Sequence, residues 1–302
     1  MAIAENSGAM STVQGAEVVD RRAVRSALSR PLRQLLRNKL GVAGIAVLLF
    51  FIVVALFAKQ LELRDPLETD VAHAVQPPSL QQPFGTDRLG RDVYSRVVAA
   101  ARVSLVLPVI SVLLGLSFGG TLGLISGYLE GWWDILISRA MDIILGLPIL
   151  VFAIVVVAFL GPGVNNTILA ITVIFIPLFA RVTQAPVLAE KNREYVIAAT
   201  SIGAGRAWIV LRHILPNIIS PVLIMGTLQM ASAILIEASI SFLGLGTTPD
   251  DPSWGRMLFD NYPLLERAPW ASIFPGLAIV LVVIAFNFVG DAVRDALDPT
   301  LI

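Results

Sequence analysis

The sequence predicts an all-α protein that crosses a membrane several times. Of its 302 residues, 56% are hydrophobic and 15% are charged, and the mean hydropathy is +0.79. Soluble domains carry about 45–50% apolar and about 25% charged residues. The apolar residues gather in six runs of membrane length. Each run must satisfy its own backbone hydrogen bonds in lipid, so we expect helices, and the sequence lacks the alternating strands of a membrane barrel.

The first predicted span is Leu40–Ala58. It contains no charged residue over 19 positions, which is enough to cross a hydrocarbon core of about 30 Å. A signal peptide would have a shorter apolar core followed by a small-residue cleavage site. We therefore expect a retained anchor, preceded by a basic tail over residues 1–39 and followed by a loop and entry segment over 59–102.

Five further spans are predicted within a core of residues 103–302, which also contains a polar loop over 186–216. Prolines within or near these spans are compatible with membrane helices and mark possible kinks. The expected spans are Val103–Gly127, a segment centred on Leu147–Leu160 that begins near Ile135, Thr167–Ala185, about Asn217–Leu243 and about Ile273–Gly290.

Six spans place both termini on the same side of the membrane. With the N-terminus inside, about 14 basic residues fall on the inner side and about 8 on the outer side. Because basic residues concentrate on the cytoplasmic side, we expect cytoplasmic termini. The loop over 186–216 then also lies in the cytoplasm.

This loop contains a short helical pattern. Tyr195, Ala198, Ala199 and Ile202 recur at helical spacing. The helix is expected to end at Gly203, because glycine readily adopts the left-handed conformation after a helix. Small residues allow a partner to approach closely, and an amphipathic helix in a groove is a common recognition mode. A loop helix that packs on its own protein explains the spacing equally well.

The loop resembles the EAA loop of ABC importer permeases. Ala198-Ala199, Gly203 and Leu215-Pro216 stand at the positions of that motif. Ile197 replaces the motif's Glu, and His213 replaces its Ile. Glu194, one turn earlier, offers a carboxylate in place of the missing one.

Other segments resemble the C-type permease subunit of dipeptide/oligopeptide ABC importers. The likeness extends from about Gly41 to Ile302. The segments that carry it are Phe84–Asp92, Arg102–Leu105, Arg212–Asn217, Ser241–Gly246 and Pro252–Gly255.

The resemblance implies the type I ABC importer permease fold, in the bacterial cytoplasmic membrane, and a subunit that catalyses no reaction itself. It implies a heterodimer with a homologous permease, two ATPase subunits and an extracytoplasmic substrate-binding protein. The residues expected to couple this chain to the ATPases are Glu194, Tyr195, Ala198, Ala199, Gly203, Gly205, Arg206, Leu215 and Pro216.

No cofactor or metal is expected in this chain. The sequence has no G-x-x-x-x-G-K-[ST] phosphate loop, so ATP and Mg²⁺ are expected on the partner ATPases. It has no cysteine, and its two histidines, His73 and His213, are far apart in sequence. The zero net charge and scattered basic residues argue against a nucleic-acid partner.

Three polar residues in the predicted spans are candidates for lining a translocation pathway: Glu237, Gln229 and Asn287. A carboxylate deep in a span is costly and often marks a pathway, but it can also be a hydrogen-bonded packing residue. Outside the spans, the carboxylates and arginines over 87–92 favour a turn neutralised by its own ion pairs over a cation site. The loop Thr247–Pro269 suits either contact with a binding protein or packing on the partner permease.

The resulting hypothesis is a permease that imports dipeptides and oligopeptides. Permeases of the same class that carry nickel, glutathione or haem are the alternatives within the family. A proton-coupled secondary transporter that uses Glu237 is the alternative from another class, although more intramembrane charge would be expected there. A membrane enzyme is disfavoured, since neither G-x-S-x-G nor H-E-x-x-H occurs in the sequence.

Overall fold

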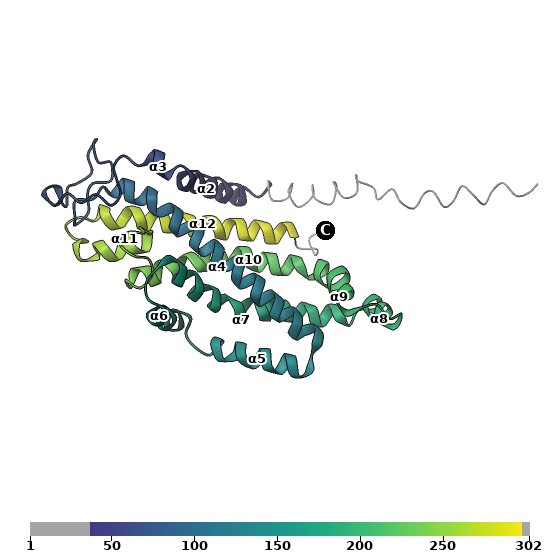
Figure 1. The fold of residues 1–302 in the computed structure, drawn as a ribbon. Coiled ribbons are helices and arrows are strands. Elements are labelled where there is room, and N and C mark those ends of the chain that lie inside the picture. Colours follow the sequence, from purple (N-terminus) through teal and green to yellow (C-terminus); the bar gives the residue numbers. More distant parts are fainter. Residues whose placement is uncertain (1–36, 298–302) are drawn as a thin grey trace, which may run out of the picture.

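The computed structural model of the protein describes residues 37–297, so nearly all of the predicted tail lies outside the described residues. Most of the long helices in the described chain run side by side in one bundle (Figure 1). Five of its helices are long and apolar enough to cross a membrane, and a bent pair makes a sixth candidate. This agrees with the predicted all-α polytopic fold.

The helices follow one another with short connections over most of the chain. In order they are α2 (Lys39–Leu56), α3 (Ala58–Leu61), α4 (Val93–Leu129), α5 (Gly131–Leu145), α6 (Ile149–Leu160), α7 (Val164–Lys191), α8 (Glu194–Ser201), α9 (Arg206–Ile209), α10 (Leu215–Phe242), α11 (Trp254–Asn261) and α12 (Trp270–Leu297). A π-helical turn, Val210–Ile214, joins α9 to α10, so that this span runs without interruption from Arg206 to Phe242. The helices α8 and α9 protrude at one end of the bundle and α11 lies at the other (Figure 1). We call these the α8 end and the α11 end.

The second span begins ten residues earlier than predicted, at Val93. Asp92 caps α4, because its Oδ2 atom accepts hydrogen bonds from the backbone N of Ser95 at 2.8 Å and from the Ser95 hydroxyl at 2.6 Å. The first turns of α4 contain Arg96 and Arg102, whose charges suggested a loop. Part of the predicted entry segment over 59–102 is therefore helix.

The third span is not one continuous helix. The axes of α5 and α6 differ by 93° across a break at Gly146, Leu147 and Pro148. Proline has no N–H to donate to a helix and disfavours helical geometry in the residue before it. The expected single span centred on Leu147–Leu160 is therefore corrected to two helices that meet at a corner.

Helices α4 and α7 approach each other closely along a row of glycines on α4. This row is Gly115, Gly119, Gly123 and Gly127, all of which face α7. A β-carbon on Gly123 would lie 2.2 Å from the carbonyl oxygen of Ala180. Close packing through small residues is how membrane helices gain contact without a hydrophobic driving force.

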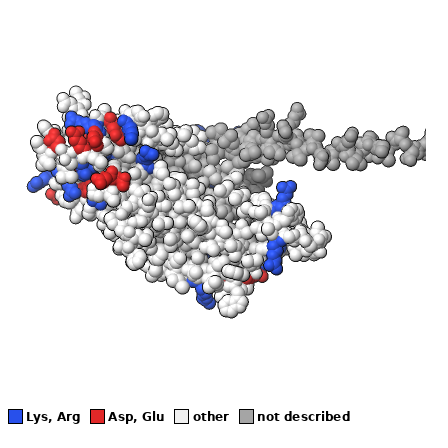
Figure 2. Space-filling model, in the orientation of Figure 1, with Lys and Arg blue, Asp and Glu red and all other residues white. Residues whose placement is uncertain are grey.

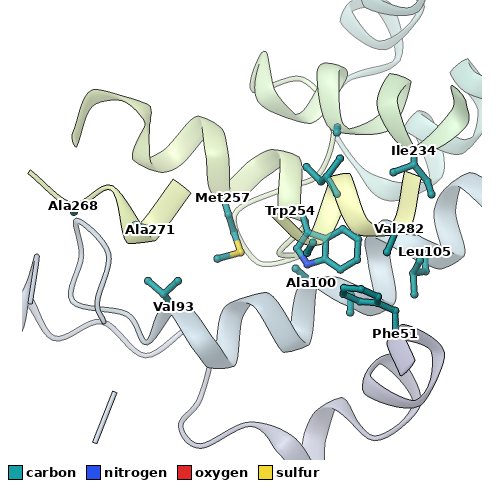
Figure 3. Close-up of a cluster of buried hydrophobic side chains, with 14 residues drawn as sticks. Phe51, Val93, Ala100, Leu105, Ile234, Trp254, Met257, Ala268, Ala271 and Val282 are labelled. Atoms are coloured by element: carbon teal, nitrogen blue, oxygen red, sulfur yellow. The ribbon is translucent and has the colours of Figure 1, made fainter. Parts of the chain in front are cut away.

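Helix α11 is anchored in the bundle by Trp254. Its indole Nε1 donates to the carbonyl of Val97 at 3.0 Å, and its backbone N donates to the Ser104 hydroxyl at 3.0 Å. Figure 3 shows the indole among buried side chains of several helices, with the ring of Phe51 from α2 edge-on at 5.5 Å. The amphipathic indole is thus fully buried with its N–H satisfied, and it fixes α11 on α4.

Candidate functional site

The loop over residues 186–216 projects from the α8 end of the bundle. Helix α8 ends as the sequence predicts, because Gly203 has φ +82°. The backbone N of Ala204 donates to the carbonyl of Ala199 at 3.1 Å, and the N of Gly203 donates to that of Thr200 at 3.0 Å. These two bonds form a Schellman motif, which satisfies the last carbonyls of a helix through a left-handed glycine.

This loop exposes three large apolar side chains beside charged ones such as Glu194 and Arg206. Ile197 is 54% exposed, Ile202 85% and Trp208 52%. Exposed apolar side chains gathered in this way mark an interaction surface. We call these three residues the α8 patch.

Some residues of the predicted apolar face of α8 are buried in the protein, and others are exposed to solvent. Ala199 and Val196 are buried in a cluster of this chain's own residues that also contains Val187, Ile209, Ile214 and Ile218. Ala198 and Ile202 point to the outside. Ala199 therefore packs on its own protein, which is one of the two interpretations of the helical spacing, because its side chain follows Val196 by nearly one turn. Ala198 remains open to a partner, and the coupling role of both alanines stays a prediction.

The other predicted coupling residues lie close to the α8 patch but differ in exposure. Glu194, Gly203, Gly205, Arg206 and Pro216 are exposed, and Leu215 is half-buried. A β-carbon on Gly203 or Gly205 would meet no atom within 4 Å. These positions are thus open to contact from outside the described chain.

Tyr195 is half-exposed and its hydroxyl faces the base of the loop. It donates to the Glu190 carboxylate and accepts from Asn217 Nδ2 at 2.9 Å. Burial, together with the hydrogen bond to Glu190, raises the pKa of Tyr195. The ring contacts His213 edge-on at 5.6 Å between centroids.

A second feature is a cavity of about 200 Å³ at the corner between α5 and α6. Its wall is mostly apolar, with side chains such as Leu145, Phe152 and Ile174. Gln229 and Ser232 of α10 supply polar atoms to the wall. The predicted pathway residue Gln229 therefore faces an open space within the bundle.

The other two predicted pathway residues lie elsewhere. Glu237 is 1% exposed, and its Oε1 accepts a hydrogen bond from the Ser241 hydroxyl at 2.8 Å. Asn287 is exposed on α12. The structure therefore does not bring Glu237, Gln229 and Asn287 together around one cavity.

Helix α5 is tied to the bundle by polar side chains at the side of α4 and α7. Asp134 Oδ1 accepts from the Ser126 hydroxyl at 2.6 Å and from Gln184 Nε2 at 2.5 Å. Asp142 forms an ion pair with Arg181. Arg181 and Gln184 were not among the predicted site residues. The sequence signal for Arg181 is a lone charge inside the predicted span Thr167–Ala185.

Charged residues gather at the α11 end, while most of the visible surface elsewhere is uncharged (Figure 2). The predicted ion-paired turn over 87–92 is confirmed, since Arg91 Nε lies 2.7 Å from Asp87 Oδ2. The network extends further than predicted, because Asp260 of α11 also pairs with Arg91 at 3.1 Å and with Arg96 at 3.4 Å. No group of acidic and histidine side chains within residues 37–297 has the arrangement of a metal site.

Comparison with known families gives two matches. Residues 119–302 match the family described as binding-protein-dependent transport system inner membrane component. Residues 26–78 match the N-terminal transmembrane domain of oligopeptide transport permease C.

Several curated proteins are similar over most of their length. The dipeptide transport system permease protein DppC of Alkalihalophilus pseudofirmus is 42% identical over 269 residues, covering 89% of this chain and 88% of the relative. The glutathione transport system permease protein GsiD of Escherichia coli O157:H7 is 42% identical over 270 residues, covering 89% of each. The di/tripeptide transport system permease protein DppC of Pseudomonas aeruginosa is 42% identical over 270 residues, covering 87% of this chain and 89% of the relative.

Among solved structures, the chain is similar to one from the inward-facing MetNI methionine ABC transporter. The TM-score is 0.55 at 17% sequence identity, and the match covers 67% of this chain and 96% of that one. At this identity the likeness concerns the fold alone, and it agrees with the expected importer permease fold.

Proposed function

The chain belongs to the family of binding-protein-dependent transport system inner membrane components, and on that premise we propose that it forms the translocation pathway of an ATP-driven importer of short peptides. As a member of this family it is a multi-pass inner membrane subunit and not an enzyme. The observation that best supports a peptide as the substrate is the 42% identity with a dipeptide permease over 89% of the chain.

The ATPase subunits would dock on the loop over 186–216. The α8 patch supports this, because Ile197, Ile202 and Trp208 are exposed at a tip that projects from the bundle. The cytoplasm, where ATP is available, would then lie at the α8 end, together with both termini. The α11 end would face an extracytoplasmic binding protein.

Work is divided among the subunits in this proposal. ATP and Mg²⁺ bind to the two ATPase subunits, and this chain contributes no cofactor site. A homologous permease completes the pathway. Each nucleotide state must favour one conformation of the permeases over the other, and the loop over 186–216 is where this difference is transmitted.

Of the three predicted pathway residues, Gln229 has the strongest support, because it lines the cavity between α5 and α6. Its amide and the Ser232 hydroxyl lie in an otherwise apolar wall, which suits a ligand with peptide groups and small side chains. Glu237 and Asn287 remain predictions for the pathway, and the buried hydrogen bond from Ser241 to Glu237 also suits a packing role.

Glutathione is the second candidate substrate. The similarity to a glutathione permease is as high in identity and coverage as that to the dipeptide permease. Glutathione is itself a peptide, so the two substrates differ less than either differs from nickel or haem.

Uptake competition separates these substrates. Proteoliposomes would contain the complex purified through a tag on this chain, with its binding protein added outside and ATP inside. The proposal predicts that unlabelled dipeptides compete with a labelled dipeptide at lower concentration than glutathione does. The glutathione candidate predicts the reverse order, and uptake of neither compound would contradict both.

A further inference from the structure

The Tyr195 hydroxyl lies where three segments of the chain meet. Tyr195 belongs to α8, Glu190 to the last turn of α7, and Asn217 to the first turn of α10. The hydroxyl donates to the Glu190 carboxylate and accepts from Asn217 Nδ2 at 2.9 Å. One oxygen atom therefore connects α8 to both membrane helices that flank the loop.

The α10 side of this connection includes an irregular turn. Val210–Ile214 is a π-helical turn, in which the backbone N of Leu215 donates to the carbonyl of Val210. Pro216 follows directly and has no N–H to donate, so regular helical bonding cannot continue at that residue. Asn217 Nδ2 also donates to the carbonyl of His213 at 2.6 Å. Asn217 thus holds the widened turn and the Tyr195 hydroxyl at once, and π turns recur at functional sites.

The remaining attachments of α8 differ on its two sides. Val196 and Ala199 pack on the bundle through apolar contact, which has no preferred direction. After α8, the chain passes through Gly203 and Gly205, where a β-carbon would meet no atom within 4 Å. The backbone bonds of Gly203 and Ala204 return to Thr200 and Ala199 of α8 itself and not to α10. Towards α7, the start of α8 is also held by the ion pair of Arg193 with Glu190 at 3.5 Å. Towards α10, the directed link from α8 is the hydrogen bond between Asn217 Nδ2 and the Tyr195 hydroxyl.

We propose that Glu190, Tyr195 and Asn217 form a joint that makes α7 and α10 follow the movement of α8 together. This inference rests on the proposed function, since the movement is the one that ATPase subunits impose on the loop. Within the joint these are positioning residues: they transmit the displacement and do not contact the transported peptide.

The test is the number of substrate molecules imported per ATP hydrolysed by the reconstituted complex. Tyr195→Phe keeps the ring and removes the hydroxyl, and Asn217→Ala removes its partner. Each is expected to lower this ratio about fivefold, the effect of one hydrogen bond of ordinary net strength. Because both act through the same oxygen atom, the double variant should lower the ratio no further than either single variant.

Two controls accompany these variants. Tyr128→Phe removes the hydroxyl of a tyrosine of α4 whose ring packs beside the cluster around Val196 and Ala199, and it should leave the ratio at the wild-type value. Glu190→Gln keeps an oxygen that accepts from Tyr195 and should stay near wild type, whereas Glu190→Ala should resemble Tyr195→Phe.

A ratio unchanged in Tyr195→Phe would overturn the joint. So would a double variant whose effect equals the product of the two single effects, since the two side chains would then act independently. Should Tyr195→Phe not assemble, the comparison of Glu190→Gln with Glu190→Ala decides in the same way. Failure of the proposed function is a different result, namely that the wild-type complex imports no peptide when given ATP.

Discussion

Replacing Asp260 by Asn should destabilise the α11 end of the protein. The Asp260 carboxylate lies among arginines: its Oδ2 is 3.1 Å from Arg91 Nη2 and 3.4 Å from Arg96 Nη2, and its Oδ1 is 3.2 Å from Arg256 Nε. The side chains of Arg91 and Arg96 are buried. The asparagine has nearly the same size, so the change removes charge and leaves the packing almost unaltered.

The expected loss of folding free energy depends on which partners Arg91 and Arg96 keep after the substitution. Removing one partner of a buried ion pair costs about 3–5 kcal/mol of folding free energy, because the other charge is left uncompensated. Here Asp87 remains, 2.7 Å from Arg91 and 3.8 Å from Arg96. The asparagine oxygen also still accepts one hydrogen bond. We therefore expect the lower end of that range, about 3 kcal/mol.

The matched control is Asp250→Asn. This aspartate precedes α11 and is exposed, and exposed substitutions of this kind change stability by less than about 0.5 kcal/mol. The measurement is chemical or thermal unfolding of the purified complex in one detergent, followed by the fluorescence of Trp254 and the other tryptophans. Equal stability of the two variants would refute the reasoning, because the buried network would then contribute nothing beyond a surface charge.

Three further changes test other parts of the account. Gly123→Ala should lower the free energy of unfolding by about 1–3 kcal/mol, because its β-carbon would lie 2.2 Å from a carbonyl oxygen of α7. Gly120→Ala is the control, since its β-carbon would meet its nearest atom at 3.8 Å and should leave stability unchanged. Matching unfolding curves for the two variants would contradict this expectation. Gly203→Asp should abolish uptake and reduce the ATPase recovered with the tagged chain, and normal values of both would remove the coupling role of the loop. Glu237→Gln should alter the rate or range of peptides transported, and unchanged uptake across a panel of dipeptides and tripeptides would leave this residue a packing role.

The regular spans could be predicted from the sequence because their signal is local. Helices α7 and α12 contain the apolar runs that predicted them and extend several residues beyond both ends, and α2 covers all but the last two residues of its predicted run. The end of α8 was also predictable, since the left-handed conformation of Gly203 depends on one residue type at one position.

The features that the sequence did not predict, namely the start of α4 and the inward face of α8, depend on residues far away in the sequence. The first turns of α4 are helical although they carry Arg96, because a carboxylate 164 positions later in the chain compensates its charge. The face that α8 turns inward is set by α7 and α10, which form the cluster around Val196 and Ala199. The spacing of apolar residues within α8 alone does not indicate that α7 and α10 pack against it.

The corner between α5 and α6 is an intermediate case. Pro148 is one of the prolines within or near the predicted spans, where kinks were expected. A proline in a membrane helix is compatible with anything from a slight bend to a break. The 93° angle also depends on the polar contacts that tie α5 to α4 and α7, such as the bond from Gln184 to Asp134. For that reason the cavity that contains Gln229 could not be predicted.

The most direct test of the central claim is dipeptide uptake into proteoliposomes that contain the complex purified through this chain. ATP inside the vesicles and the binding protein outside are supplied or omitted in turn, with and without an imposed proton gradient. The account predicts uptake that requires both ATP and the binding protein and that is indifferent to the gradient. Uptake driven by the proton gradient without ATP would contradict it and would favour a secondary transporter that uses Glu237.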